Sequence, residues 1–264
     1  MRVACIGDLH LLSGRDPHRT LYARREFFTA GYASLQRLIG QVNARRPDLV
    51  VFLGDLVDWV SAENVAFAVE FLKQVQAPWL SVPGNHDLAE PLGGLEAQRT
   101  AMHRRHKRYW REQGIDLDNR WLDAGDFGLV LLDNSLSDVE ADGVIWLDEQ
   151  LQRKPCNLVC QHVPLDIPQN RAHIHAIAPG RDLRTYTCSG NPGLFASHYR
   201  GRVQAVCNGH VHIGGRTQSD DCVHHLHSLA LTLTDPHRHE ATTASATLLT
   251  FDDGRFHAET LLAD

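Results

Sequence analysis

The stretch "RVACIGDLH" at residues 2–10 sets a design that the chain repeats. An apolar run of a few residues with high β-propensity stops at a glycine followed by an acidic residue. Related stretches are "DLVVFLGD" (48–55), "APWLSVPGNHD" (77–87), "NLVCQH" (157–162) and "VQAVCNGH" (203–210). Short continuous apolar runs are typical of central strands that are covered on both faces. The sequence therefore predicts a set of buried strands that each end in polar residues.

Helical patterns follow the first three of these strands. Residues 22–45 and 62–75 place apolar side chains at helical spacing, and Ser61 or Asn64 is expected to cap the second of these helices. Residues 95–112 indicate a further, basic helix. Because strands and helices alternate, we expect right-handed crossovers and a largely parallel sheet.

The rest of the chain has a different pattern. Residues 120–135 predict a hairpin, and residues 143–154 predict a short helix. Residues 213–264 are β-rich, with "DDG" as a hairpin turn. We therefore expect an α/β fold in which two mixed β-sheets form a sandwich flanked by helices. The length and the lack of internal repeats fit a single domain over residues 1–264, with 213–264 as its C-terminal part.

Composition and charge exclude several classes of protein. Apolar residues make up 43% and charged residues 22% of the chain, as in ordinary globular proteins. The net charge of −6 argues against binding to a nucleic-acid duplex. No apolar run is long enough for a membrane span, and the N-terminal residues lack the features of a signal peptide.

The six cysteines show no CxxC pairing. Cys5, Cys160 and Cys207 fall in apolar runs that predict buried strands, where reduced thiols fit better than disulfides. We therefore expect a cytoplasmic protein. The β-rich C-terminal region could provide the edge of a homodimer, although the sequence leaves the oligomeric state open.

The polar residues at the strand ends are expected to converge, because ligands bind beyond the carboxyl ends of the strands in open α/β sheets. They are oxygen and nitrogen donors, which favour Mn, Fe or Zn, and the absence of cysteine among them argues against a structural zinc knot. The set comprises Asp8, His10, Asp55, Asp58, Asn85, His86, Asp87, His162, His210 and His212.

In this order the set resembles the calcineurin-like metallophosphoesterases. The motifs that carry the resemblance are "GDLH" (7–10), "GDLVD" (54–58), "GNHD" (84–87), "QH" (161–162) and "GHVH" (209–212). The resemblance implies a four-layer α/β/β/α sandwich and a centre with two metal ions, divalent or of mixed valence. It implies that one ion is held by Asp8, His10, Asp55 and His212. The other would be held by Asp55, Asn85, His162 and His210, with Asp55 bridging the two ions.

Physical chemistry supports this assignment. Two dications about 3.5–4 Å apart clamp a phosphate and lower the pKa of a water that bridges them. The shared carboxylate of Asp55 offsets repulsion between the cations. Asn85 contributes a neutral amide oxygen, which limits the negative charge that an anionic substrate meets.

His86 does not match a ligand position. The resemblance implies that it lies over the phosphate and protonates the leaving group or stabilises the transition state, with Asp87 fixing its tautomer. The alternative is that His86 only packs in its loop. Asp58 is expected to support the site or to cap a helix rather than to bind metal directly.

Two further motifs, "LLDNS" (131–135) and "GVIWLDEQL" (143–151), resemble the branch of class III cyclic nucleotide phosphodiesterases and glycerophosphodiesterases. We therefore expect a phosphodiesterase that acts on cyclic nucleotides or small organic phosphodiesters through a hydroxide that bridges the metals. The alternative is a phosphomonoesterase or nucleotide pyrophosphatase of the same superfamily. A noncatalytic metal-binding scaffold is a third hypothesis, although such scaffolds often lack a ligand or the histidine of the "GNHD" motif.

An insert at residues 169–192 separates two of the metal-binding segments. We expect it to have little regular structure and to set substrate specificity, with Arg171, Arg181 and Arg184 as candidate substrate contacts. The basic run at 102–111 is either a solvated helix face or a surface that attracts an anionic substrate.

The stretch "VHHLH" at residues 223–227 falls in a strand pattern. Alternation places His225 and His227 on one face of the strand and His224 on the other. No partner set accompanies them, so we assign them no ligand role and treat them as a candidate wall of the cleft.

Overall fold

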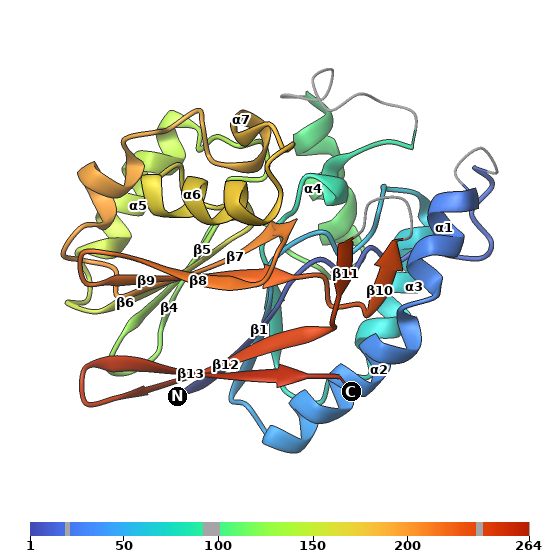
Figure 1. Cartoon of the computed structure of the whole chain (residues 1–264), viewed down its shortest axis with the longest axis horizontal. Helices are drawn as coiled ribbons and strands as arrows, with labels where there is room; N and C mark the ends of the chain where they lie inside the picture. Colours follow the sequence, from blue (N-terminus) through green and yellow to red (C-terminus); the bar gives the residue numbers. More distant parts are fainter. Residues whose placement is uncertain (19–21, 92–100, 236–239, 264) are drawn as a thin grey trace.

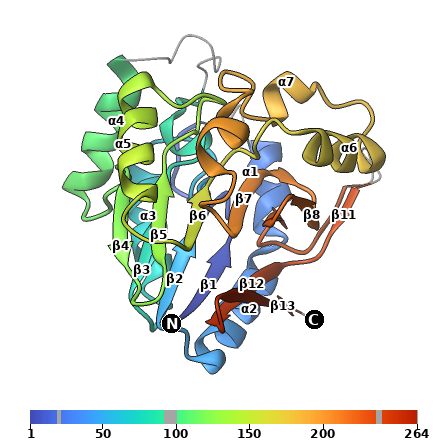
Figure 2. The same cartoon turned by 90° about the vertical axis from the view of Figure 1, so that its left-hand side faces the viewer.

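The computed structural model describes residues 1–18, 22–91, 101–235 and 240–263. Two mixed sheets face one another, and helices cover their outer faces, as Figures 1 and 2 show. This arrangement confirms the predicted sandwich. Among the helices of the described ranges, none combines the length and the apolar character that crossing a membrane requires.

The first sheet has five strands in the order β13-β12-β1-β2-β3. Strand β1 lies at its centre, parallel to β2 and antiparallel to β12, so the two ends of the chain meet in one sheet. The strands span β1 (Arg2–Ile6), β2 (Leu49–Phe52), β3 (Trp79–Ser81), β12 (Ser245–Asp252) and β13 (Arg255–Leu262).

The second sheet has six strands in the order β4-β5-β6-β7-β9-β8. Strands β5, β6, β7 and β9 run parallel, and the edge strands β4 and β8 run antiparallel to their neighbours. The strands span β4 (Arg120–Asp123), β5 (Gly128–Leu132), β6 (Asn157–Gln161), β7 (Ala205–His212), β8 (Gly215–Ser219) and β9 (Cys222–Ser228). A separate ribbon pairs β10 (Leu233–Asp235) with β11 (Glu240–Thr242).

The helices cover the sheets from outside, with α2 and α3 beside the first sheet and α5 and α6 beside the second (Figure 1). Their bounds are α1 (Tyr22–Thr29), α2 (Tyr32–Arg45), α3 (Ala62–Leu72), α4 (Ala101–Glu112), α5 (Ala141–Leu151), α6 (Pro168–Ile177) and α7 (Leu183–Tyr186). Ser61 caps α3, as predicted, because its side chain accepts a hydrogen bond from the backbone N–H of Asn64.

The facing sides of the two sheets form a dry layer. Val3, Cys5 and Val51 of the first sheet pack in one buried cluster with Leu158 and Cys207 of the second. This layer fixes the spacing between the sheets and therefore between the loops at their carboxyl ends.

The helix predicted over residues 22–45 is two helices, α1 and α2, separated at Ala30 and Gly31. A side chain at position 31 would meet its neighbours too closely, since a Cβ there would lie 2.8 Å from Cβ of Leu231. The prediction failed because helical periodicity does not reveal such a close approach. The helix predicted over 95–112 begins in residues outside the described ranges, and α4 covers its second half.

The insert at residues 169–192 was expected to be irregular, and the structure corrects this. Pro168 starts α6 at a position where a proline needs no hydrogen bond, and a second short helix, α7, follows. Ile174 of α6 is fully buried against Val211 and Leu226, which anchors the insert to the second sheet.

Gly31, which precedes α2, and Gly40, which lies within it, allow a matched test of their effects on the free energy of unfolding. We expect Gly40→Ala to raise the free energy of unfolding by about 0.5–1 kcal/mol, because a methyl group in a helix interior restricts the unfolded chain. The added atom meets no other atom within 4 Å at Gly40. Gly31→Ala should lower the free energy of unfolding by roughly 1–3 kcal/mol through overpacking against Leu231. Urea unfolding of both variants measures the difference, and equal effects would contradict the assigned contact.

Candidate metal centre

The polar strand ends converge as the sequence predicts, and they form two groups. In the first group, one ligand atom from each residue lies within 4.8 Å of every other, and its members are Asp8, His10, Asp55 and His212. The second group meets the same criterion and consists of Asp55, His162 and His210. Asp55 belongs to both groups. Its position between them is what a bridging ligand requires.

Asn85 joins the second group through its amide oxygen. Oδ1 of Asn85 lies 3.0 Å from Nε2 of His162. The same Nε2 lies 3.2 Å from Nδ1 of His210 and 3.3 Å from Oδ2 of Asp55. Three further donor atoms therefore lie within 3.3 Å of Nε2 of His162, and such a cluster of donors is suited to hold a cation.

Each histidine ring uses one nitrogen to bind a partner outside the centre, and this identifies the other nitrogen as the one that faces the centre. Nδ1 of His10 lies 2.8 Å from Oδ1 of Asp58, and Nδ1 of His162 lies 2.7 Å from the carbonyl oxygen of Leu53. Both acceptors require an N–H on Nδ1, so Nε2 of each ring is the nitrogen that faces the centre and could bind a cation. His210 is held the other way round, with Nε2 3.0 Å from the carbonyl oxygen of Thr185 and Nδ1 facing His162.

Backbone strain is concentrated at the same residues. Asp8, His10, Asp55, His210 and His212 all have φ between 44° and 71°, in the left-handed region. Residues other than glycine rarely adopt this conformation, and they persist in it where the surrounding structure enforces it. Since five of the seven predicted ligands share the same strain, the turns after β1 and β2 and the last residues of β7 are shaped for the site rather than for local stability.

Two glycines make the close approach of these turns possible. A Cβ at Gly84 would lie 2.0 Å from Oδ1 of Asp55, and a Cβ at Gly209 would lie 2.7 Å from Oδ2 of Asp8. Neither distance is compatible with a side chain. The glycines in "GNHD" and "GHVH" are therefore required by the carboxylates of the neighbouring strands.

The electrostatics of the pocket favour positive charge. Burial alone would lower the pKa of His162, but the carboxylates of Asp55 and Asp8 raise that pKa to about 9. Burial and the neighbouring His162 lower the pKa of His210 to about 3. The carboxylates thus attract a proton to one imidazole, and the second imidazole cannot accept another. A divalent cation bound by these groups would replace that proton.

His86 lies beside this centre but is not part of either group. Its ring meets the His10 ring edge-on at 4.8 Å between centroids. Nδ1 of His86 lies 2.8 Å from the carbonyl oxygen of Asp58, which assigns the proton to Nδ1 and leaves the lone pair on Nε2. The side chain is 25% exposed, so it borders the open side of the centre.

The predicted role of Asp87 is wrong in one respect. We expected this carboxylate to fix the tautomer of His86, but the backbone turn directs it into the protein. Its two oxygens accept hydrogen bonds from the backbone N–H groups of Val57 and Gly84. Burial and the charge of Asp55 raise the pKa of Asp87 to about 7. Asp87 therefore ties together the two loops that carry Asp55 and Asn85, and Asp58 orients His86 instead.

Asp58 supports the site, as the sequence predicts, but the sequence did not reveal how many residues it contacts. Besides holding His10 and His86, it forms an ion pair with Arg24 of α1. Although burial opposes its ionisation, the hydrogen bond from His10 and the positive neighbours keep the pKa of Asp58 well below its usual range. The "GDLVD" motif contained the signal for this role, because Asp58 follows Asp55 by only three residues.

Asn134 was also missed as a contributor. Its Oδ1 accepts hydrogen bonds from the backbone N–H groups of His162 and Val163, at 3.0 Å and 2.9 Å. Its amide nitrogen donates to the carbonyl oxygen of Val163. Asn134 therefore fixes the backbone that carries His162, and the motif "LLDNS" could have revealed it.

The basic run at 102–111 has a structural role on one face of α4. Trp110 donates from Nε1 to the carbonyl oxygen of Asp87, and Nδ1 of His106 lies 2.8 Å from the carbonyl oxygen of Leu88. Both residues are buried. This face of α4 supports the short helix His86–Leu88, so the predicted solvated face is only part of the helix.

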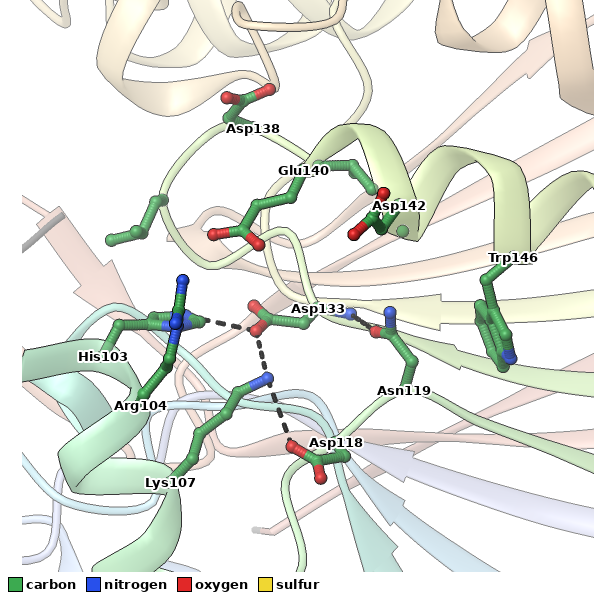
Figure 3. Close-up of a pocket in the computed structure, with 13 residues that line it drawn as sticks. His103, Arg104, Lys107, Asp118, Asn119, Asp133, Asp138, Glu140, Asp142 and Trp146 are labelled. Atoms are coloured by element: carbon green, nitrogen blue, oxygen red, sulfur yellow. Dashed lines mark hydrogen bonds and ion pairs between the residues drawn. The ribbon is translucent and has the colours of Figure 1, made fainter. Parts of the chain in front are cut away.

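The same helix borders a pocket of about 650 Å³, shown in Figure 3. At its floor Asp133 contacts both His103 and Lys107, at 3.2 Å and 2.5 Å. The pocket is lined by further carboxylates, but none of the candidate metal ligands contributes to it. The pocket is linked to the metal centre by one loop, in which Asp133 lines the pocket and the next residue, Asn134, holds the backbone of His162.

The three arginines of the insert have different surroundings. Arg171 pairs with Asp166, and Arg184 pairs with Asp182 on an exposed surface. The guanidinium of Arg181 lies 4.7 Å from the centroid of the Tyr186 ring, and that ring lies 5.4 Å from the ring of His210. Of the three arginines, Arg181 is thus the one that contacts a neighbour of a candidate metal ligand, since Tyr186 lies between it and His210.

The histidines of "VHHLH" lie in β9, away from both ligand groups. His225 and His227 share one face, as predicted, and line a cavity of about 720 Å³ together with His212. His224 packs on the opposite face near Phe195, with ring centroids 5.6 Å apart. Within the described residues, none of the three belongs to a group of candidate metal ligands at the centre.

Comparisons with known proteins agree with this geometry. The chain is 28% identical to a 3',5'-cyclic-nucleotide phosphodiesterase of Nostoc sp. over 236 residues, which cover 86% of this chain and 76% of that protein. It is 27% identical to a glycerophosphodiester phosphodiesterase of Enterobacter lignolyticus over 234 residues, or 80% of this chain and 78% of that protein.

The fold is similar to that of a dimetal phosphatase from Danio rerio, with a TM-score of 0.57, 16% identity and coverage of 100% and 99% of the two chains. A family model described as calcineurin-like phosphoesterase matches residues 1–214. Because this match covers most of the chain, the protein belongs to the calcineurin-like phosphoesterase family.

Proposed function

We propose that this metal-dependent phosphoester hydrolase cleaves phosphodiesters, namely cyclic nucleotides or small organic phosphodiesters, at a centre with two metal ions. The observation that carries the proposal is the pair of donor groups that share Asp55. The preference for diesters rests on the two relatives that are named as phosphodiesterases.

The donor set indicates which ions fit. Carboxylate, amide and imidazole donors suit Mn, Fe or Zn, and we propose that two such ions, divalent or of mixed valence, occupy the two groups. When bound, the ions would supply the positive charge that holds a phosphate and activates water. The first ion would be held by Asp8, His10, Asp55 and His212, and the second by Asp55, Asn85, His162 and His210.

The remaining residues act on the substrate or position the ligands. With Nδ1 held by the Asp58 carbonyl, His86 can carry a proton on Nε2 toward the oxygen of the leaving alcohol. Asp87 acts as a positioning residue, because it joins the loops of Asp55 and Asn85. Arg181, beside Tyr186 and His210, is the best placed of the insert's arginines to contact an anionic substrate.

We further propose that the protein works in the cytoplasm as an enzyme for small molecules. All six cysteines are free thiols, and five of them are buried. Reduced thiols of this kind fit a reducing compartment.

Substitution of two histidine clusters tests the assignment of ligands. His210→Gln should lose roughly half of the bound metal after reconstitution with Mn(II) and dialysis, because the second group then lacks an inward-facing nitrogen. The double variant His225→Gln and His227→Gln should keep the metal content of the wild type, since neither residue belongs to a ligand group. Elemental analysis measures both. Equal metal loss in the two variants would contradict the assignment.

Substitution of His86 separates catalysis from metal binding. His86→Ala should retain both ions and lower kcat for bis(p-nitrophenyl) phosphate by about 10²–10⁴-fold, the usual contribution of a general acid. If the reading of His86 as a residue that only packs in its loop were right, kcat would stay within a few-fold of the wild type. A wild type that binds metal and hydrolyses no phosphoester would favour a noncatalytic scaffold instead.

A substrate panel tests the class of ester. With Mn(II) bound, kcat/KM should be higher for bis(p-nitrophenyl) phosphate and for cyclic nucleotides or glycerophosphodiesters than for p-nitrophenyl phosphate and nucleotide pyrophosphates. A clear preference for the monoester or the pyrophosphate would replace the proposed activity by that of the alternative hydrolase.

A further inference from the structure

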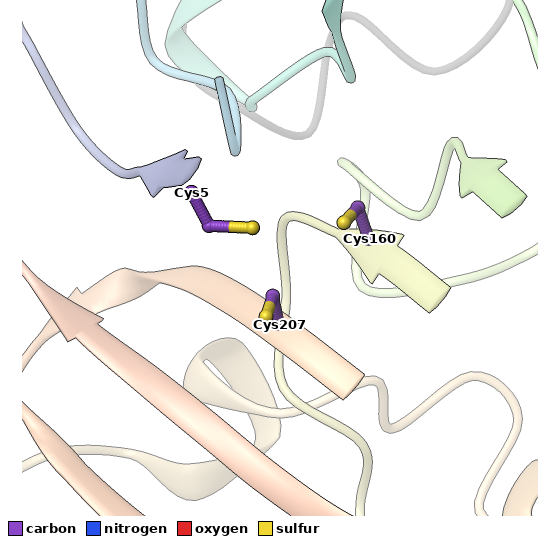
Figure 4. Close-up of side chains that lie close together, drawn as sticks. All are labelled: Cys5, Cys160 and Cys207. Atoms are coloured by element: carbon purple, nitrogen blue, oxygen red, sulfur yellow. The ribbon is translucent and has the colours of Figure 1, made fainter. Parts of the chain in front are cut away.

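Three cysteines face one another in the layer between the two sheets (Figure 4). The sulfur atoms of Cys5, Cys160 and Cys207 all lie within 4.8 Å of one another. Cys5 belongs to β1 of the first sheet, whereas Cys160 and Cys207 are paired in register on β6 and β7 of the second. All three side chains are fully buried. The two sheets thus bring together three thiols that are far apart in sequence.

The cluster lies on the strands that carry the candidate metal ligands. Cys5 of β1 precedes Asp8 by three residues, Cys160 of β6 precedes His162 by two, and Cys207 of β7 precedes His210 by three. The thiol cluster and the centre are nevertheless separate, because they share no residue. The cluster contains only sulfur donors, and the centre contains only oxygen and nitrogen donors.

A cavity of about 720 Å³ is lined by strand neighbours of two of these cysteines. It opens between β8 and β9 of one sheet and β12 and β13 of the other, and His225 and Thr247 line it. His225 pairs in register with Cys207, and Thr247 pairs in register with Cys5. Because paired neighbours on adjacent strands point to the same face, His225 and Thr247 of the cavity wall lie beside Cys207 and Cys5.

The imidazoles of His225 and His227, which line the cavity, can offer a nitrogen lone pair to a metal ion. Burial lowers the pKa of His225 to about 3, so its ring is uncharged at neutral pH. Nδ1 of His227 lies 3.0 Å from the carbonyl oxygen of Asn208. Nε2 of the same ring is buried and has no hydrogen-bond partner among the described residues. A buried nitrogen without a partner is unusual, and a bound water or ion is one explanation for it.

We propose that Cys5, Cys160 and Cys207 form a second metal site, which binds one Cu(I) ion that enters through the cavity lined by His225 and His227. Thiolates are soft ligands that favour Cu(I), Zn or iron–sulfur clusters over the ions that prefer oxygen donors. Three sulfur donors complete the trigonal coordination that Cu(I) accepts, whereas structural zinc sites almost always have four ligands. The harder donors around Asp55 bind the ions of the catalytic centre, so ligand chemistry sorts the two kinds of metal.

Binding requires no change in oxidation state. Each thiol that coordinates the ion forms an S–Cu bond and releases its proton to water, and copper remains monovalent. This inference does not depend on the substrate or the activity proposed above.

A competition experiment under anaerobic, reducing conditions tests the site on the Mn(II)-loaded protein. Cu(I) is supplied from a chromogenic Cu(I) chelator, whose absorbance reports how much ion the protein removes. The wild type should take up one Cu(I) per chain without losing Mn(II). Cys160→Ala or Cys207→Ala should weaken Cu(I) binding by more than the roughly 10–100-fold that loss of an outer-shell partner typically causes.

Cys222→Ala is the matched control, because Cys222 is also buried but lies outside the cluster. It should bind Cu(I) as the wild type does. X-ray absorption on the Cu(I)-loaded wild type provides a measurement that needs no variant and should show a first shell of sulfur. The proposal is overturned if the wild type takes no Cu(I), if uptake displaces Mn(II), if the first shell is nitrogen or oxygen, or if Cys222→Ala loses as much affinity as the cluster variants.

Discussion

The structure depends on the crowding of carboxylates and imidazoles around Asp55. Such groups repel one another or compete for the same protons unless positive charge lies between them, which is why the His162 ring becomes positively charged and the His210 ring stays neutral. The fold keeps them together with left-handed turns that are unfavourable by themselves and with glycines that let neighbouring turns nearly touch. These features have a physical reason only if the pocket receives cations.

Around this pocket a second layer of hydrogen bonds restricts the orientation of the candidate ligand side chains. Asp58 holds His10 and His86, and Asn134 holds the backbone of His162. Helix α4 supports the segment after Asn85 through Trp110. The donors therefore keep their orientation on rigid elements, and a bound phosphate would meet groups that need little rearrangement.

The sequence predicted the strands, their polar ends and the order of the ligand motifs, because parallel strands of each sheet end at one edge and the two sheets face one another. It could not predict where Asp87 points, since this depends on how the backbone turns after Asn85 rather than on residue type. The split between α1 and α2 was missed because it comes from contact with Leu231, about 200 residues away. The helices of the insert were missed because their apolar positions are few, and burial of Ile174 against the second sheet decides their structure. The substrate contacts of Arg171, Arg181 and Arg184 remain predictions.

The position of β1 between β2 and β12 also governs how the chain must fold during synthesis. Strand β1 finds its neighbour β2 early in synthesis and must wait for β12 until the long intervening chain is made. The contact between His10 and His212 joins residues 202 positions apart. Contacts of such long range form late, because the entropy of closing the intervening loop must first be overcome. An emerging chain therefore exposes the apolar edge of β1, and ions that reach it early find only part of the donor set.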